Sequence, residues 1–431
     1  MSTEASAPAS SARSIKTGHI AEGAAFSIIM ALSFSHFLND MMQSLVPALY
    51  PMWKGEFGLS FAQIGIITLV TQVTSSILQP AVGLFSDHRP QPYSLAVGMG
   101  ATLIGLLLLA NAGSYPVLIC AAALVGVGSA VFHPEASRVA RLASGGRHGL
   151  AQSLFQVGGN IGSSLGPILA AFIVIPRGQS SIAWFSSAAL LAMMVLFGVG
   201  NWYRKEQAGP ARAGGHRSTE RSHLSRRNVA WSVAILLALV FSKSFYTSSL
   251  NSFYTFYLIS RFHVSVETAQ FYLFAFLAAV AAGTLIGGPV GDRIGRKRVL
   301  WISIVGVLPF ALILPYVDLF WTGILTVVIG LVLASASSAI IVYALELVPG
   351  KVGTVAGLFF GLSFGMAGIG AAALGRLADA TSIDFVYRVC AFLPLLGLLT
   401  VLLPDLGREQ RTRRASPVAG STATQGAAAS R

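Results

Sequence analysis

Ionisable side chains are rare in the long apolar stretches of this sequence, and those that occur stand at helical spacing. His36 and Asp40 are four residues apart, as are Asn39 and Gln43, so a helix places all four on one face. An ionisable group in the middle of a membrane helix costs about 2.5–3.5 kcal/mol and is therefore expected to face an interior cavity. A partly dry cavity disfavours the charged carboxylate, so Asp40 can take up a proton on one side and release it on the other. The alternative is a carboxylate that a fixed partner keeps charged and that holds helices together.

A second group of such residues lies further along the chain, at His133, Glu135 and Arg138. Glu135 and Arg138 are three residues apart and can pair on a helix, which would make Glu135 structural. A proton relay through Glu135 and His133 is the competing interpretation. Pro134 removes a backbone hydrogen bond here, and such irregularity within a membrane helix is typical of a segment that lines a cavity.

The stretch near residues 149–175 carries two different stripes. One side has amides at spacing four, namely Gln152, Gln156 and Asn160. The other side has glycines at the same spacing, namely Gly158, Gly162 and Gly166, with Pro167 after them. The glycines let a neighbouring helix approach closely. The amides would be costly on a lipid-facing surface, so we expect them to line a path and to offer neutral donors and acceptors to a polar solute.

The second part of the chain has one central cation in an apolar stretch, Lys243, followed by Tyr246 and Asn251. Lys243 is the best single candidate for attracting an anionic substrate such as a phosphonate. The alternative is an interior salt bridge, for example to Asp40, and both can hold if the two anions compete for Lys243. A further stretch adds two path candidates three residues apart, Tyr343 and Glu346.

The composition indicates that these residues sit in a membrane protein. Of 431 residues, 54% are hydrophobic and 10% are charged, whereas soluble domains carry roughly 25% charged residues. The net charge of +13 comes from basic residues in short loops rather than on one face, so it indicates membrane topology rather than nucleic-acid binding. The two cysteines offer neither a disulfide framework nor the spacing of a metal site.

Apolar runs long enough to span a bilayer, roughly 20 residues, predict twelve transmembrane helices. Six fall in the first part of the chain, near 24–50, 61–85, 93–112, 115–140, 149–175 and 181–203. Six fall in the second part, near 229–259, 267–291, 298–316, 320–347, 352–378 and 384–404.

An even number of spans puts both termini on one side, and the lysines and arginines concentrate in the loops of that side. That side is therefore predicted to be cytoplasmic. The predicted fold is an all-α membrane protein with two pseudo-symmetric six-helix bundles. Its predicted parts are a disordered tail (1–23), a first bundle (24–203), a cytoplasmic linker (204–228), a second bundle (229–404) and a disordered tail (405–431).

The two predicted bundles repeat each other at one constant offset. Gly83 and Asp87 correspond to Gly288 and Asp292, and Ser60 corresponds to Ser265 at the same offset. A duplicated set of six spans in one register is typical of transporters whose halves rock around a central site.

Several motifs resemble those of a known family. The loop Gly288-Pro-Val-Gly-Asp-Arg-Ile-Gly-Arg-Lys297 resembles the signature loop of the major facilitator superfamily, and Gly83-Leu-Phe-Ser-Asp-His-Arg89 resembles its degenerate counterpart. Residues 162–171 are similar to the antiporter motif of drug–proton exchangers, with Ala170 and Ala171 in place of the usual glycine pair.

Three longer strings, at residues 36–45, 132–148 and 155–163, resemble bacterial efflux members of this superfamily, and the resemblance covers roughly 25–405. It implies a proton-driven exporter. It also implies a monomer, which is the usual state of members of this superfamily. It further implies that the two loops latch the halves in the outward-facing state, through charge and helix-end contacts. The gating candidates are Gly83, Asp87, Arg89, Gly288, Asp292, Arg293, Arg296 and Lys297.

The sequence therefore predicts a secondary transporter of the bacterial inner membrane that exchanges protons for a small, polar, anionic drug. Asp40, Glu135, His36 and His133 are the candidates for proton coupling. The alternative on the same scaffold is proton-coupled uptake of an organic anion. Phosphate-binding glycine loops and catalytic constellations are absent from the sequence, which disfavours an ATP-driven pump or an enzyme. The expected partners are the substrate, protons and the lipid bilayer, with no cofactor, no metal and no nucleic acid.

Overall fold

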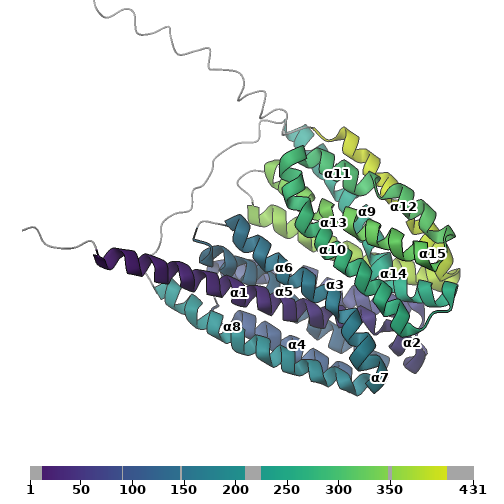
Figure 1. The fold of residues 1–431 in the computed structure, drawn as a ribbon, viewed down its shortest axis with the longest axis horizontal. Coiled ribbons are helices and arrows are strands. Elements are labelled where there is room, and N and C mark those ends of the chain that lie inside the picture. The colour runs from purple at the N-terminus through teal and green to yellow at the C-terminus, as the bar shows by residue number, and fades with distance from the viewer. Residues whose placement is uncertain (1–11, 90, 146–147, 209–224, 348–351, 405–431) are drawn as a thin grey trace, which may run out of the picture.

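The computed structural model describes residues 12–89, 91–145, 148–208, 225–347 and 352–404, and the ordered elements in these ranges are helical (Figure 1). Those of the first part are α1 (Ala12–Ala48), α2 (Tyr50–Phe57), α3 (Phe61–His88), α4 (Ser94–Ala110), α5 (Tyr115–Ala143), α6 (His148–Leu169), a π turn (Ala170–Val174), α7 (Ile175–Arg177), a 3-10 turn (Gln179–Trp184) and α8 (Phe185–Ala208).

The second part continues the same pattern. Its elements are α9 (Arg226–Phe262), α10 (Val266–Ile294), α11 (Arg296–Val305), α12 (Leu308–Ile313), a 3-10 turn (Leu314–Tyr316), α13 (Leu319–Leu347), α14 (Val352–Ala380), α15 (Ile383–Cys390) and a 3-10 helix, η4 (Leu393–Leu402).

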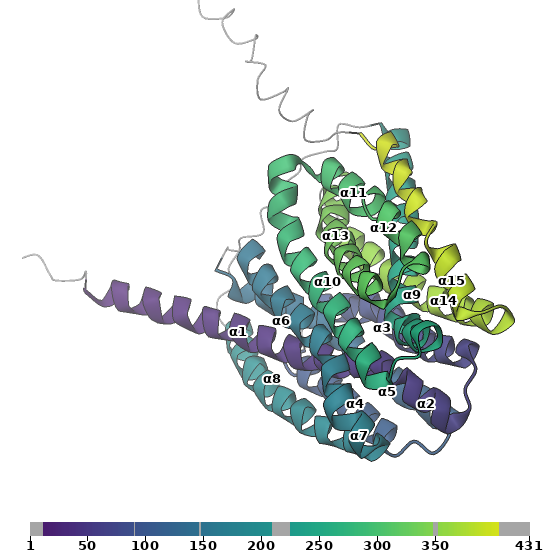
Figure 2. The same ribbon diagram turned by 45° about the vertical axis from the view of Figure 1, so that its right-hand side comes forward.

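Helices of the two parts gather on different sides of the molecule. In both ribbon views α1, α4, α5, α6 and α8 lie together, and α9 to α15 lie beyond them (Figures 1 and 2). Two pairs of long helices connect the two sides, because α3 packs against α14 and α6 packs against α10. Residues far apart in the sequence therefore meet along these two helix pairs.

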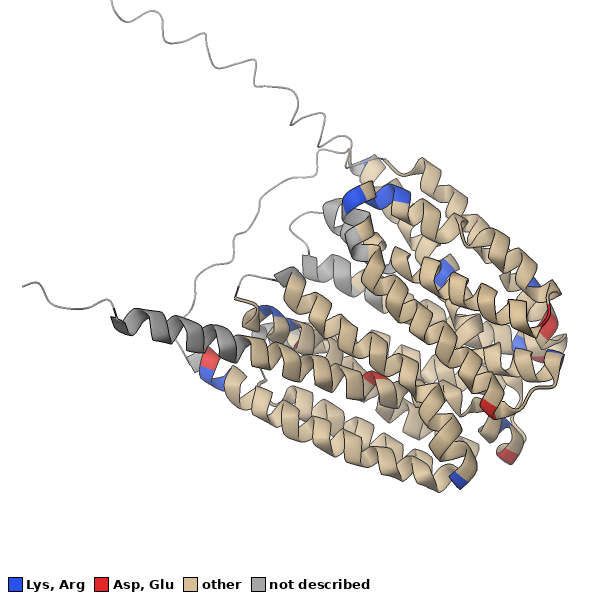
Figure 3. Cartoon of the chain, in the orientation of Figure 1, with Lys and Arg blue, Asp and Glu red and all other residues tan. Residues whose placement is uncertain are grey.

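The described surface is that of a membrane protein. Ten helical segments are long and apolar enough to cross a bilayer, and Ser94–Ala110 is a shorter apolar helix. Large apolar side chains such as Phe172, Met194 and Phe320 are exposed on the outside. Charged residues gather towards the helix ends, while the middle of the helix array is almost free of them (Figure 3). The chain is a multi-pass membrane protein.

Some predicted boundaries differ from the structure. α1 begins at Ala12, inside the segment 1–23 that was predicted to be disordered, and no proline interrupts the sequence between residues 12 and 23. α8 runs to Ala208, into the predicted linker, because the residues after Tyr203 include the good helix formers Arg204, Lys205 and Glu206. Most of the linker, and the tail from residue 405, lie outside the described residues.

Proline residues mark the irregular parts of the helices. Pro167 lies near the end of α6, and the π turn at Ala170–Val174 follows it, because proline has no N–H to donate to the preceding turn. The last predicted span is α15 followed by the 3-10 helix η4, which has Pro394 in its first turn. Despite these breaks, Leu150–Arg177 and Ile383–Leu402 each remain long and apolar enough to cross a bilayer as one span.

Candidate functional site

Three ionisable side chains from two helices meet between α1 and α5. On α1, Nε2 of His36 lies 3.3 Å from Oδ2 of Asp40, one helical turn away. From α5, Nε2 of His133 lies 3.7 Å from the other carboxylate oxygen, Oδ1. His36 is buried, and 19% of the Asp40 side chain is exposed. We call His36, Asp40 and His133 the histidine–aspartate cluster.

Backbone carbonyls favour one tautomer of each imidazole ring in this cluster. Nδ1 of His36 lies 2.8 Å from the carbonyl oxygen of Phe155, and Nδ1 of His133 lies 3.0 Å from that of Ser129. A carbonyl only accepts, so an Nδ1 that bonds to it carries a proton. In a neutral ring the remaining nitrogen, Nε2, then carries a lone pair, and both lone pairs face the Asp40 carboxylate. Nδ1 of His133 also lies 3.2 Å from Oγ of Ser129, which can donate to it in the other tautomer.

Two ring nitrogens and a carboxylate that all face one another as acceptors favour the uptake of a proton between them. The ligand atoms of the cluster all lie within 4.8 Å of one another. One added proton turns either ring into an imidazolium, whose positive Nε2–H faces the Asp40 carboxylate while its Nδ1–H keeps its carbonyl. The arrangement can therefore hold one exchangeable proton inside the membrane-spanning part of the molecule.

Polar neighbours complete the surroundings of Asp40. Nδ2 of Asn39 donates to Oδ1 of Asp40 (2.9 Å), and Oγ of Ser163 on α6 donates to Oδ2 (3.4 Å). Gly159 brings α6 against the cluster, because a Cβ there would overlap the His36 ring and lie 2.8 Å from Oδ2 of Asp40. A side chain at position 159 would therefore disturb the cluster itself.

The glycine stripe of α6 packs against α1. A Cβ at Gly158 or Gly162 would overlap the carbonyl oxygen of Ser33 or Phe37, and one at Gly166 would overlap Oγ of Ser44. The close contact of these two helices holds the Phe155 carbonyl and Ser163, both on α6, at a fixed distance from His36 and Asp40.

Glu135 and its helix partner form a separate pair. Glu135 is buried on α5, and its Oε1 lies 3.8 Å from Nη1 of Arg138. The ligand atoms that lie within 4.8 Å of one another around Asp40 come from the two histidines, and Glu135 is not in that group. Pro134 stands inside α5 without ending it.

The predicted path amides fall into two kinds. Gln152 accepts from Oγ of Ser137 at 3.0 Å, which ties α6 to α5. In contrast, the buried amide nitrogens of Gln43 and Asn160, and the amide oxygen of Asn251, have no hydrogen-bond partner among the described residues. Gln156 is half-buried on the same helix as Asn160. Buried polar atoms in this state are expected to meet water or a polar ligand.

The candidates of the second part of the chain lie on α9 and α13. Lys243 is half-buried in the middle of α9, with Tyr246 buried one turn later. The salt bridge to Asp40, which was one alternative for Lys243, is not among the described contacts of Asp40, namely those with the two histidines, Asn39 and Ser163.

Tyr343 on α13 is bound away from the cluster. Its Oη donates to the carbonyl oxygen of Pro404 at 2.5 Å, at the end of the described chain. This bond engages the hydroxyl with the backbone rather than with a solute path. The side chain of Glu346 lies outside the described residues.

The predicted gating loops are only partly described. The side chains of Asp87 and Asp292 and the glycine Gly288 lie outside the described residues, and a Cβ at Gly83 would meet nothing within 4 Å. Arg89 and Arg293 are exposed, and Arg296 is half-buried.

Lys297, the last residue of the second predicted gating loop, is bound within its own side of the molecule. Its Nζ donates to the carbonyl oxygen of Val401 at 3.1 Å and to that of Leu403. It thus binds the end of η4 in this structure, and its role as a latch between the halves stays a prediction.

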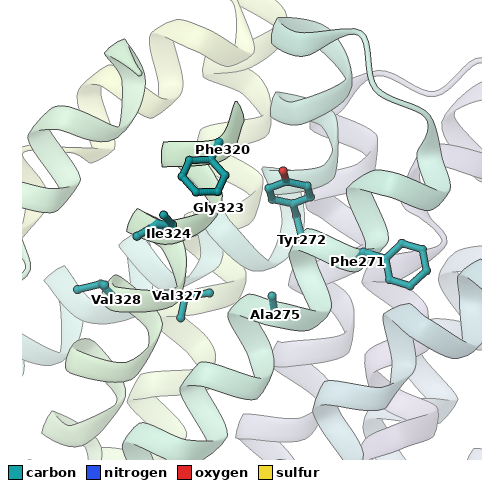
Figure 4. A pocket seen from close by; sticks show the side chains of 8 residues that line it. All are labelled: Phe271, Tyr272, Ala275, Phe320, Gly323, Ile324, Val327 and Val328. Carbon is teal, nitrogen blue, oxygen red and sulfur yellow. The ribbon is translucent and has the colours of Figure 1, made fainter. Parts of the chain in front are cut away.

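A recess of about 400 Å³ lies between α10 and α13, away from the cluster (Figure 4). No charged side chain lines it, and Phe271 and Phe320 are exposed at its rim. It is a groove in the apolar outer surface and does not offer the groups that a polar solute needs.

A multi-pass helical protein with a buried histidine–aspartate cluster, and with buried amides that have no described partner, has the architecture of a membrane transporter. The sequence profile of the Major Facilitator Superfamily matches residues 32–271 and 244–428. The chain belongs to this superfamily, and it is a transporter of small molecules.

Individual relatives agree with this assignment. The chain is 60% identical over 380 residues to the fosmidomycin resistance protein of Escherichia coli (strain K12), covering 88% of this chain and 93% of that protein. It is 42% identical over 381 residues to an uncharacterized MFS-type transporter of Bacillus subtilis (strain 168), with the same coverage.

Solved structures show the same fold. A bacterial homologue of the human lysosomal transporter Spinster, in an inward-facing and occupied conformation, has a TM-score of 0.69 at 14% identity and covers 90% of this chain and 96% of its own. A nucleoside transporter has a TM-score of 0.67 at 14% identity, with 87% of this chain and 98% of its own covered.

Sequence reasoning placed His36 and Asp40 together but treated His133 as part of another group. Gly159 and Ser163 were not singled out, although both lie beside residues that were. Their signal is the adjacent glycine pair Gly158-Gly159 and a hydroxyl one turn further on. Only the packing of α6 on α1 shows what these positions touch.

Proposed function

We propose that this protein exports small anionic drugs of the fosmidomycin kind in exchange for protons. The observation that carries the proposal is the 60% identity to a fosmidomycin resistance protein, which extends over nearly the whole length of both chains. The strings at 36–45, 132–148 and 155–163 surround the histidine–aspartate cluster, so the resemblance includes the part of the molecule where we place the chemistry.

The proposal includes a topology of twelve spans in two six-helix bundles. The ten apolar segments, together with α1 and Ser94–Ala110, supply that number. The distribution of lysine and arginine supports cytoplasmic termini in the bacterial inner membrane. We take the transporter to act as a monomer, as the resemblance implies.

Proton coupling is assigned to the histidine–aspartate cluster. One added proton lets either His36 or His133 face the Asp40 carboxylate as a donor, and its loss leaves the lone pairs of both rings opposed to the carboxylate. We propose that the carrier crosses the membrane either with this proton or with cargo, which makes the exchange obligatory. Glu135, held by Arg138 at 3.8 Å, has a supporting role.

Cargo recognition is assigned to the polar groups around the cluster and on α9. Gln43 and Asn160 offer buried amide donors that have no described partner, and such donors suit the oxygen atoms of an anion. Lys243 supplies positive charge on the other side of the molecule. A polar anion lying between them would contact both bundles.

The charge of the cluster also favours the alternative, proton-coupled uptake of an organic anion. A protonated cluster attracts a nearby anion more strongly than an unprotonated one, so electrostatics alone promotes joint binding of proton and cargo. The direction of transport in our proposal therefore rests on the relative and on the antiporter-like residues 162–171, not on charge.

Transport into everted membrane vesicles tests the proposal. We expect fosmidomycin to accumulate when the vesicle interior is acid, and we expect Asp40→Asn to abolish this accumulation. Cys120→Ser, an exposed position on α5, is the matched control and should transport like the wild type. Full proton-driven accumulation by Asp40→Asn would refute the coupling assignment. Accumulation only when the gradient is reversed would favour uptake.

A further inference from the structure

The carboxylate of Asp379 joins the two parts of the chain at the end of α14. Its Oδ1 accepts from the backbone N–H of Phe61 at 2.8 Å, and its Oδ2 accepts from that of Ala62 at 2.7 Å. Phe61 and Ala62 are the first two residues of α3, in the other part of the chain. Asp379 was not among the residues singled out in the sequence.

These two bonds complete the N-terminus of α3. The first N–H groups of a helix have no partner within it. Ser60 and Gln63 form a capping box, in which the backbone N–H of each donates to the side chain of the other (2.9 and 3.1 Å). The N–H groups of Phe61 and Ala62 remain, and Asp379 accepts from both while its negative charge faces the positive end of the helix.

The crossing of α3 and α14 is tightest at the same end. A Cβ at Gly375 would overlap the carbonyl oxygen of Phe61, and one at Gly65 would overlap that of Ala371. At Gly361, further along α14, the nearest atom of α3 is at an ordinary contact distance of 3.6 Å. The backbones of α3 and α14 are thus closest near Asp379, and the distance between them increases away from it.

Other contacts close this end as well. Nε2 of Gln270 on α10 donates to the carbonyl oxygen of Ala48, at the end of α1, at 2.6 Å, and Gln270 is fully buried. The ring of Phe61 lies against those of Phe253 and Phe256 on α9, with centroids 6.3 and 5.2 Å apart. Every one of these contacts joins the first part of the chain to the second.

We propose that Asp379 is a charged latch that holds this end of the transporter closed and must release α3 when the end opens. The proposal needs only a carrier whose two ends open in turn, so it goes beyond the cargo and direction proposed above. The latch has no duplicate in the internal repeat, because the offset that pairs Ser60 with Ser265 pairs Asp379 with Val174. Because its two bonds join the halves only when this end is closed, the latch favours the closed end over the open one.

The test compares state populations in the purified full-length protein in nanodiscs, without cargo and without a proton gradient. Spin labels at Glu56→Cys and Thr381→Cys, both exposed positions at this end, report its width in a Cys120→Ser background. Asp379→Asn loses the charge and one of the two acceptors. We expect it to raise the ratio of the wide to the narrow distance by about tenfold.

Two further variants separate the latch from a general loss of structure. Ala62→Pro removes one donor to Asp379 from the other side, at a helix position that tolerates proline, and should shift the ratio in the same direction by a smaller factor. Asp318→Asn is the matched control, because Asp318 accepts from the N–H of Trp321 at 2.9 Å within the second part of the chain. It should leave the ratio unchanged. Folded Asp379→Asn and Ala62→Pro proteins with the wild-type distribution would overturn the proposal, whatever the cargo proves to be.

Discussion

Replacing Gly159 by alanine adds one methyl group at the histidine–aspartate cluster. That methyl would overlap Cε1 and Nε2 of His36 and would lie 2.8 Å from Oδ2 of Asp40. An ordinary contact needs 3.4 Å or more, so either the imidazole must turn away or α6 must retreat from α1. Overpacking of this kind costs about 1–3 kcal/mol.

The cost is expected to appear in the function more than in the fold. If the ring of His36 turns away, the shared proton loses one of its acceptors, and about 1–3 kcal/mol corresponds to a roughly 5- to 150-fold weaker proton site. We expect Gly159→Ala to lose most proton-driven drug accumulation in everted vesicles. Its melting temperature in detergent should fall by only a few degrees.

Substitutions at two other glycines serve as comparisons for Gly159→Ala. Gly158→Ala would press on the backbone carbonyl of Ser33, which cannot turn aside, so it should mainly lower stability and yield. Gly198→Ala on α8 meets nothing within 4 Å and should behave like the wild type. If Gly159→Ala transports and melts like Gly198→Ala, the cluster does not have the geometry on which our reasoning depends.

Three further predictions concern single side chains. His133→Gln cannot take up a proton beside Asp40, and we expect cargo-driven proton release from vesicles to fall severalfold while the protein stays folded; unchanged release would remove His133 from the cluster's function. Lys243→Gln removes the central cation of α9, so the KM for an anionic drug should rise about tenfold with little change in the maximal rate, and an unchanged KM would exclude Lys243 from recognition. Tyr343→Phe removes the hydroxyl that binds the carbonyl oxygen of Pro404, so it should lower stability by about 1 kcal/mol in thermal melts and leave transport intact. A loss of transport would indicate that Tyr343 contacts the cargo.

The sequence was most informative where the answer depends on neighbours along one helix. His36 and Asp40 are one turn apart, and helical periodicity alone predicts that they share a face. The apolar runs likewise predicted the positions of the helices, because spanning a bilayer fixes both their length and their composition.

The sequence was least informative where two helices meet. His133 approaches Asp40 only because α5 packs beside α1. A salt bridge from Lys243, one of the two roles open to that side chain, is not among the described contacts of Asp40. Asp379 binds backbone N–H groups more than 300 residues away. Backbone donors are the same at every position, so no residue type at Phe61 or Ala62 could have revealed this contact.

The end of η4 is tied down by two long side chains. Lys297 binds the carbonyl oxygens of Val401 and Leu403, and Tyr343 binds that of Pro404. A pull on the chain beyond residue 404 would first have to break these three hydrogen bonds. We therefore expect that a fluorescent or affinity domain fused there leaves the histidine–aspartate cluster undisturbed.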